Sequence, residues 1–77
     1  MTKEASAQRV VEDLRVEMFR KRISQDRLAS LTGISQSRIS RRLNGEVSPT
    51  IEDVAIIAGA LGLQVEISFV ARPEVAA

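Results

Sequence analysis

The chain has 77 residues, of which 44% are hydrophobic, and it contains no cysteine and no histidine. This length suits one small domain, and the missing residue types exclude disulfides and the usual ligands of a structural zinc site. No metal or cofactor is expected, and so small a core is expected to gain stability by oligomerisation. The polar N-terminus and the lack of a long apolar run predict a cytoplasmic protein.

The net charge of +1 hides an uneven distribution of charge along the chain. Residues 1–19 carry a net charge of −1, residues 20–42 carry +6 and residues 43–77 carry −4. A local basic block matters more to a polyanion than the net charge of the whole chain. The middle third therefore indicates contact with nucleic acid, although a solvated charged face would have the same composition.

Four helices are predicted from the spacing of apolar residues and from the residues that begin and end helices. They are expected at about residues 5–21, 25–32, 36–44 and 50–61. Ser24 and Ser35 are good N-caps for the second and third helices, and Gly33 is suited to end the second. Together the four helices make up one domain over residues 1–63.

The C-terminal part of the chain contains the fourth helix and then a change of periodicity. This helix can begin either at Ser48, with Pro49 as its first residue, or at Thr50. Apolar and polar residues then alternate within residues 64–72, which predicts a half-buried strand that belongs to the same domain. The apolar members of this strand are Val65, Ile67 and Phe69. Residues 73–77 are expected to form a frayed tail.

The second and third helices have the spacing of a helix-turn-helix unit. Counted from Gln25, the fifth residue must be small because the helices cross there, and it is Ala29. The ninth residue must allow a sharp turn, and it is Gly33. The fifteenth must be a branched apolar residue that seats the third helix on the second, and it is Ile39.

With these positions the chain resembles the phage repressor and Cro family of bacterial and phage proteins, also called the lambda-repressor-like or XRE family. The resemblance covers roughly residues 10–63. It is carried by the run Ser24-Gln25-x-x-Leu28-Ala29-x-x-x-Gly33-Ile34-Ser35-Gln36-Ser37-x-Ile39-Ser40-Arg41, by Asn44-Gly45 and by the stretch AGALGL. Two positions depart from the family pattern, because Arg42 replaces a usually apolar residue and Arg22 replaces a frequent glycine. The resemblance implies a mostly α, compact four-helix domain that binds double-stranded DNA.

The resemblance also implies that the third helix enters the major groove, with its exposed side chains on base edges. The expected base contacts are Gln36, Ser37, Arg38 and Arg41. The expected contacts to the DNA backbone are Arg22, Gln25, Ser35, Ser40, Arg42 and Asn44. Arginine forks suit guanine and glutamine suits adenine. Each of these residues also has an ordinary interpretation as solvated surface or helix start, and Arg42 could equally cover the edge of the core.

The C-terminal strand predicts a homodimer, because a single strand leaves its own backbone groups unpaired. No other segment offers a pairing partner, so two copies are expected to pair antiparallel and to bury Val65, Ile67 and Phe69 at the interface. The alternative is that a different protein covers the strand. A two-fold dimer predicts an operator that is an inverted repeat, with half-sites about 34 Å apart or a multiple of that.

The sequence therefore predicts a transcriptional regulator, a repressor or Cro-like protein of a bacterium or phage, that associates with the nucleoid. One alternative is an antitoxin that represses its own operon and binds a toxin. Another is a protein-interaction module that kept the fold and lost contact with DNA. A toxin or an antirepressor is the kind of protein partner that the chain could have. Without histidine or cysteine the chain offers few candidates for acid-base catalysis, so it is not expected to be an enzyme. RNA binding is disfavoured because the two aromatic residues, Phe19 and Phe69, fall on apolar faces.

Overall fold

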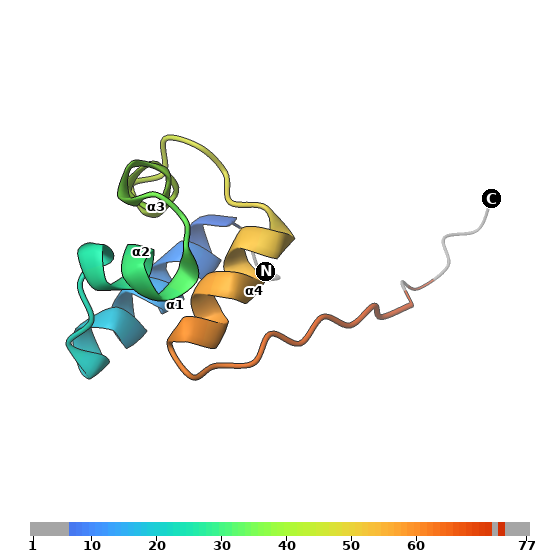
Figure 1. Cartoon of the computed structure of the whole chain (residues 1–77). Helices are drawn as coiled ribbons and strands as arrows, with labels where there is room; N and C mark the ends of the chain where they lie inside the picture. Colours follow the sequence, from blue (N-terminus) through green and yellow to red (C-terminus); the bar gives the residue numbers. More distant parts are fainter. Residues whose placement is uncertain (1–6, 72, 74–77) are drawn as a thin grey trace.

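The computed structural model describes residues 7–71 and 73, and this part of the chain contains four α-helices (Figure 1). Their bounds are α1 Ala7–Lys21, α2 Gln25–Thr32, α3 Gln36–Leu43 and α4 Ile51–Ala60. The expected mostly helical, four-helix fold is confirmed. Residues 5–6 of the predicted first helix, residue 72 of the predicted strand and residues 74–77 of the predicted tail lie outside the described residues.

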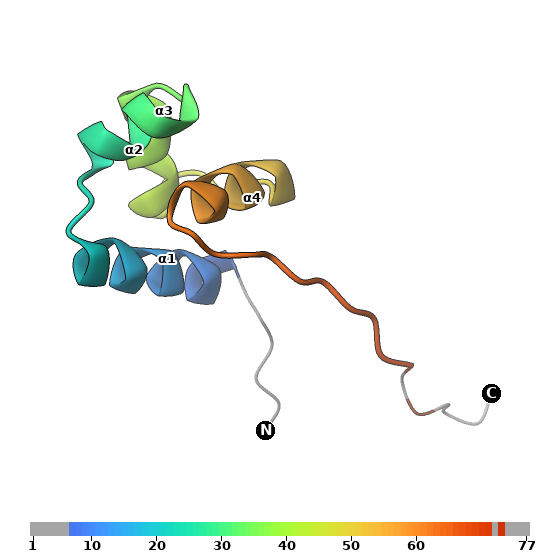
Figure 2. The ribbon, with the colours of Figure 1, turned by 60° about the horizontal axis from the view of Figure 1, so that its bottom comes forward.

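One apolar core lies where the four helices meet. Figure 2 shows α1 along one side of the domain and the other three helices together on the opposite side. Leu28 of α2, Ile39 of α3 and Ile57 of α4 have almost no exposed surface. The rest of this buried cluster is Val11, Leu14, Met18, Leu43, Ala58 and Leu61. Burial of each large aliphatic side chain stabilises the fold by roughly 1.5–3 kcal/mol, so the core fixes how α3 sits against α2 and α4.

Three of the helices begin with a hydroxyl side chain as N-cap. The hydroxyls of Ser24, Ser35 and Thr50 each accept a hydrogen bond from the backbone N–H three residues later, at 3.1, 3.2 and 3.0 Å. These bonds satisfy N–H groups that have no partner within their own helix. Of the two starts that the sequence allows for α4, the structure has the one at Thr50.

The end of α1 places an arginine in a backbone conformation that usually belongs to glycine. Arg22 has a φ of 57°, in the left-handed region. Its N–H donates to the carbonyl of Phe19 at 3.2 Å, and the N–H of Ile23 donates to the carbonyl of Met18 at 2.9 Å. These two bonds form the Schellman motif, whose left-handed position is most often a glycine. Arg22 therefore departs from the family pattern at a position with a backbone cost.

The segment after α4 is extended and leaves the domain (Figure 1), and residues 7–71 and 73 contain no strand. Val65 packs partly against the core, whereas Ile67 is exposed and Phe69 is 95% exposed. A strand requires a second backbone to pair with, and no described part of this single chain supplies one. The strand over residues 64–72 and its pairing in a dimer are therefore unconfirmed and stay predictions.

Phe19 does not lie where the sequence places it. Its side chain is 84% exposed on α1, although it neighbours the buried stripe along the chain. The buried stripe of α1 consists of Val11, Leu14 and Met18, and Phe19 follows directly after Met18, about 100° around the helix. The interpretation of Phe19 as part of an apolar buried face is therefore wrong.

Candidate nucleic-acid interface

The turn between α2 and α3 has the geometry that the spacing of the sequence predicts. Gly33 has a φ of 80°, and its N–H donates to the carbonyl of Ala29 at 2.9 Å, which closes the end of α2. Leu28 and Ile39 are fully buried where the two helices pack. This sharp turn lets α3 cross α2 with its opposite face free.

Thr32 reinforces this turn, and the sequence analysis did not identify it. Its hydroxyl donates to the carbonyl of Leu28 at 2.7 Å and accepts from the N–H of Ile34 at 3.1 Å. One side chain thus joins the last turn of α2 to the first residue after the bend. A threonine directly before the turn glycine is the signal that could have revealed it.

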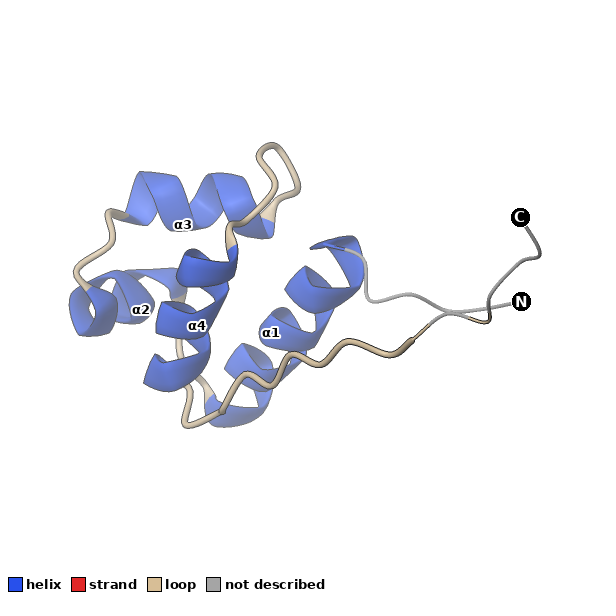
Figure 3. Ribbon diagram, turned by 90° about the vertical axis from the view of Figure 1, so that its right-hand side faces the viewer, coloured by secondary structure: helices blue, strands red, loops and turns tan. Residues whose placement is uncertain are grey.

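One face of α3 is exposed and polar, and it carries all four predicted base-contact residues. Figure 3 shows α3 along an outer edge of the domain. Ile39 and Leu43 are buried on the inner face. The exposed residues are Gln36, Ser37, Arg38, Arg41 and Asn44. The side chains of Gln36, Ser37 and Arg41 make no hydrogen bond or ion pair with the described residues, so their polar groups are available to a ligand.

Two arginines of α3 share one carboxylate of α4. Arg38 donates from Nη2 to Oδ1 of Asp53 at 3.0 Å, and Arg42 donates from Nε to Oδ2 of the same residue. Asp53 is 2% exposed and is the one buried polar or charged residue of residues 7–71 and 73. The Arg42 side chain is 16% exposed and the Arg38 side chain 51%. This position of Arg42 favours a role at the edge of the core over a phosphate contact.

The environment of Asp53 keeps its carboxyl group ionised. Burial by itself would raise the pKa of Asp53. The hydrogen bond from Arg42, the positive charges of Arg38 and Arg42 and the Thr50 hydroxyl outweigh burial, so the pKa lies below its usual value of 3.8. At neutral pH the cluster therefore contains one negative and two positive charges.

The ion pairs reduce the basic charge that residues 20–42 can offer to DNA. Arg20 and Lys21 both pair with Glu17, each at 3.3 Å, and Lys21 also donates to the carbonyl of Leu61. Arg38 and Arg42 pair with Asp53. Glu17 and Asp53 lie outside residues 20–42 in the sequence, so the net charge counted over that segment does not include them. Three of its basic side chains have no acidic partner among the described residues: Arg22, Arg27 and Arg41.

A groove between the end of α1 and the start of α2 contains two of the predicted backbone contacts. Arg22 and Gln25 line it together with the N-cap Ser24. Arg15 and Arg20 of α1 complete its basic lining, and the sequence analysis missed Arg15 because it precedes the basic block. Free N–H groups at a helix start and nearby arginines are suited to a phosphate. The other predicted backbone contacts, Ser35, Ser40, Arg42 and Asn44, belong to α3 and its two ends.

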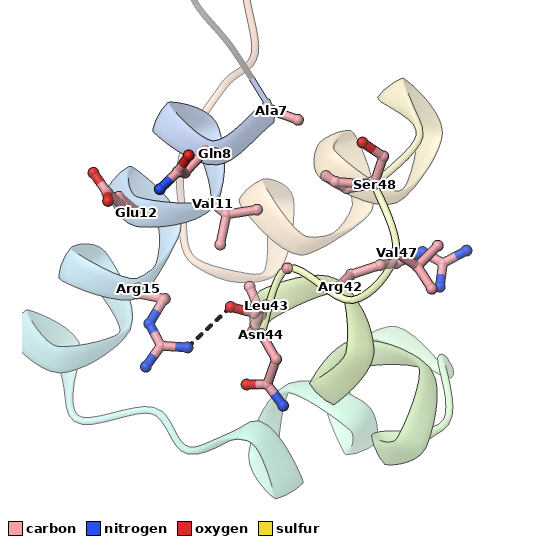
Figure 4. A pocket seen from close by; sticks show the side chains of 12 residues that line it. Ala7, Gln8, Val11, Glu12, Arg15, Arg42, Leu43, Asn44, Val47 and Ser48 are labelled. Carbon is pink, nitrogen blue, oxygen red and sulfur yellow. Dashed lines mark hydrogen bonds between the residues drawn. The ribbon is translucent and has the colours of Figure 1, made fainter.

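A second groove lies between the first half of α1 and the loop from α3 to α4 (Figure 4). Arg15 lines this groove and donates from Nη1 to the carbonyl of Leu43 at 3.0 Å, which connects α1 to the end of α3. The Asn44 side chain donates to Oγ of Ser40 at 3.3 Å. Residues 7–71 and 73 contain no group of three or more acidic side chains placed to hold a metal ion. The role of this region is structural, because the bond from Arg15 holds the end of α3 against α1.

A short helix, a tight glycine turn and a second helix with a free polar face define a helix-turn-helix domain. The helix-turn-helix family HTH_3 matches residues 13–67, and the chain belongs to this family. The resemblance to phage repressor and Cro-type proteins is thereby confirmed, and these are DNA-binding domains. No curated protein and no solved structure gives a significant match. None of the helices in the described part of the chain is long and apolar enough to cross a membrane.

Proposed function

We propose that the protein is a sequence-specific regulator of transcription, a repressor or Cro-like protein, that places α3 in the major groove of double-stranded DNA. The observation that carries this proposal is the polar face of α3. Gln36, Ser37 and Arg41 are exposed and have no side-chain partner among the described residues, whereas Ile39 is buried. These side chains match the donor and acceptor patterns of base edges in the major groove. The protein would act in the cytoplasm, on the nucleoid.

Contacts with the DNA backbone would come from the two ends of the recognition unit. Arg22 directly after α1 and Gln25 at the start of α2 would approach one phosphate, with the dipole of α2 adding attraction. Asn44, Ser40 and the N-terminus of α3 at Ser35 would approach the strand along the groove. These contacts set the register of α3 on the duplex, whereas the base contacts set its sequence preference.

Two copies would bind together as a homodimer joined through residues 64–72. In support, residues 64–71 are extended, and the side chains of Ile67, Phe69 and Val70 are exposed. Antiparallel pairing of two such segments would satisfy the backbone groups along their shared edge and would place Ile67 and Phe69, which share one face of the strand, at the interface. The two recognition helices would then enter major grooves about 34 Å apart, or a multiple of that, on an inverted-repeat operator.

Selection from a pool of random duplexes at about 150 mM salt tests the proposal, because weak nonspecific binding is suppressed there. The native protein should enrich an inverted repeat. Arg41→Ala should lose the preference at one position of each half-site, whereas Arg9→Ala, which removes one charge from α1, should keep the whole motif. If the native protein enriches no motif, sequence-specific binding is ruled out.

The same exposed tail supports a second candidate function, that of an antitoxin. Ile67, Phe69 and Val70 could be covered by a strand of a toxin instead of by a second copy of this chain. Such a protein would still bind its own operator through α3. Gel filtration at high micromolar concentration separates the two: a dimer favours self-pairing, whereas a monomer leaves the tail open to a foreign partner.

A further inference from the structure

We propose that Asp53 of α4 is a positioning residue that determines sequence specificity, by holding the Arg38 guanidinium in place to bind a guanine. This inference rests on the proposed function and adds a residue on a helix that would not itself enter the groove. Arg38 is the base-contact candidate that already has an internal partner, through its bond to Asp53 at 3.0 Å. The bond decides where the rest of the guanidinium can point.

The geometry leaves Arg38 able to bind a base while it is held. A guanidinium has five N–H donors in one plane, and the bond from Nη2 to Oδ1 uses one of them. The side chain is still 51% exposed, so the remaining donors are accessible from solvent. A guanine presents O6 and N7 as two neighbouring acceptors, which suit two parallel N–H groups of an arginine.

The position of Asp53 is itself fixed by burial, by Arg42 and by the backbone of α4. It is 2% exposed, and Oδ2 accepts from Nε of Arg42, whose side chain is 16% exposed. Its backbone N–H donates to the Thr50 hydroxyl at 3.0 Å, so the residue belongs to the capped first turn of α4. Because Arg42 occupies the second oxygen, Asp53 cannot turn away from Arg38 without breaking a buried ion pair.

A role in stability alone does not account for this arrangement. Buried ion pairs contribute little net stability compared with apolar residues of similar volume. The ion pair instead orders a long side chain before the DNA arrives. Ordering of a flexible arginine opposes binding unless the order already exists in the free protein.

The decisive variant is Asp53→Leu combined with Arg42→Leu, which replaces the buried pair by apolar side chains and leaves Arg38 without its support. Duplexes with each base changed in turn give the preference at every position of the half-site. Arg38→Ala identifies the position that Arg38 binds. The double variant should keep its melting transition and its binding to random duplex, and should lose about tenfold in preference at that position alone. An unchanged preference in the folded double variant overturns the proposal.

Asp53→Asn provides a second test that does not depend on the double variant folding. It retains the size of the side chain and one oxygen acceptor, and it should weaken the preference at the Arg38 position while leaving the Arg41 position intact. Adding Asp53→Asn to Arg38→Ala should cause no further loss at that position, because Asp53 acts only through Arg38. An equal loss at all positions would mean general damage to α3 and would contradict the proposal. If the native protein shows no base preference at any position, the proposed function fails, and this inference with it.

Discussion

Arg22 occupies a left-handed backbone position directly after α1, where it lines the groove proposed to receive a phosphate. Non-glycine residues in this conformation cost about 1–2 kcal/mol. The same position gives the arginine its place beside the start of α2, so one residue would combine backbone strain with the proposed phosphate contact. Strain of this kind is often found at functional positions.

Replacement of Arg22 by glycine should raise stability and weaken DNA binding. Relief of the left-handed strain is expected to outweigh the greater freedom of glycine in the unfolded chain, with a net gain of up to about 1 kcal/mol. Thermal unfolding of Arg22→Gly and Arg22→Ala measures this gain, since both variants lose the same charge and only glycine relieves the strain. Arg22→Gly should melt at the higher temperature, and both should bind duplex equally weakly; equal melting temperatures would contradict the strain argument.

Because the pKa of Asp53 is lowered in the folded protein, the free energy of unfolding depends on pH. The folded-state pKa lies below the value of 3.8 expected for the unfolded chain, so the stabilisation is complete above 3.8 and is lost as the pH falls through the folded-state pKa. Urea unfolding from neutral pH down to about pH 3 should show a smaller loss of stability in Asp53→Asn than in the native protein. Parallel curves for the two proteins would mean that Asp53 has the same pKa in the folded and unfolded states.

At the scale of elements, local contacts were predictable from the sequence and contacts between distant elements were not. Ser24 and Ser35 cap their helices through bonds to residues three positions away, so the sequence contains both partners. The contact of Arg42 with Asp53 depends on how the loop of residues 44–50 places α4 against α3. The spacing of apolar residues does not predict the course of that loop. The exposure of Phe19 was missed because the buried stripe of α1 is narrow.

Replacement by alanine should change stability in opposite directions at Gly33, which follows α2, and at Gly59, inside α4. At Gly33, φ is 80° and a Cβ would meet nothing within 4 Å, so Gly33→Ala should destabilise through backbone strain alone, by about 1–2 kcal/mol. Gly59 lies inside α4, where a Cβ also meets nothing within 4 Å, so Gly59→Ala should stabilise by about 1 kcal/mol. Chemical unfolding measures both; a loss of stability in Gly59→Ala would show that the interior of α4 does not tolerate a Cβ.

At the scale of the whole molecule, the four helices form a domain with an exposed polar face on α3, and the extended tail is the segment proposed to bind a second chain. The alternating pattern of residues 64–72 predicts a strand, but an intermolecular strand cannot be verified in one chain. The unpaired backbone and the exposed Phe69 explain why a domain this small would gain stability from a second copy.

Ile67→Ser combined with Phe69→Ser should convert a self-paired dimer into a monomer. The change removes apolar surface that pairing would bury, while α3 is untouched, so binding to a single half-site should persist and binding to the inverted repeat should weaken strongly. Sedimentation at several protein concentrations measures the oligomeric state. Val16→Ser removes an exposed apolar residue from α1 and serves as the control; a double variant as dimeric as this control would place the interface elsewhere.

The central claim is that the exposed face of α3 recognises DNA sequence, and the ratio of affinities for the selected duplex and a scrambled duplex tests it most directly. At about 150 mM salt the native protein should prefer the selected duplex by about 10³-fold or more. Arg38→Ala combined with Arg41→Ala should bring the ratio close to one while the protein remains folded. A ratio close to one for the native protein, or an unchanged ratio in the double variant, would contradict the claim.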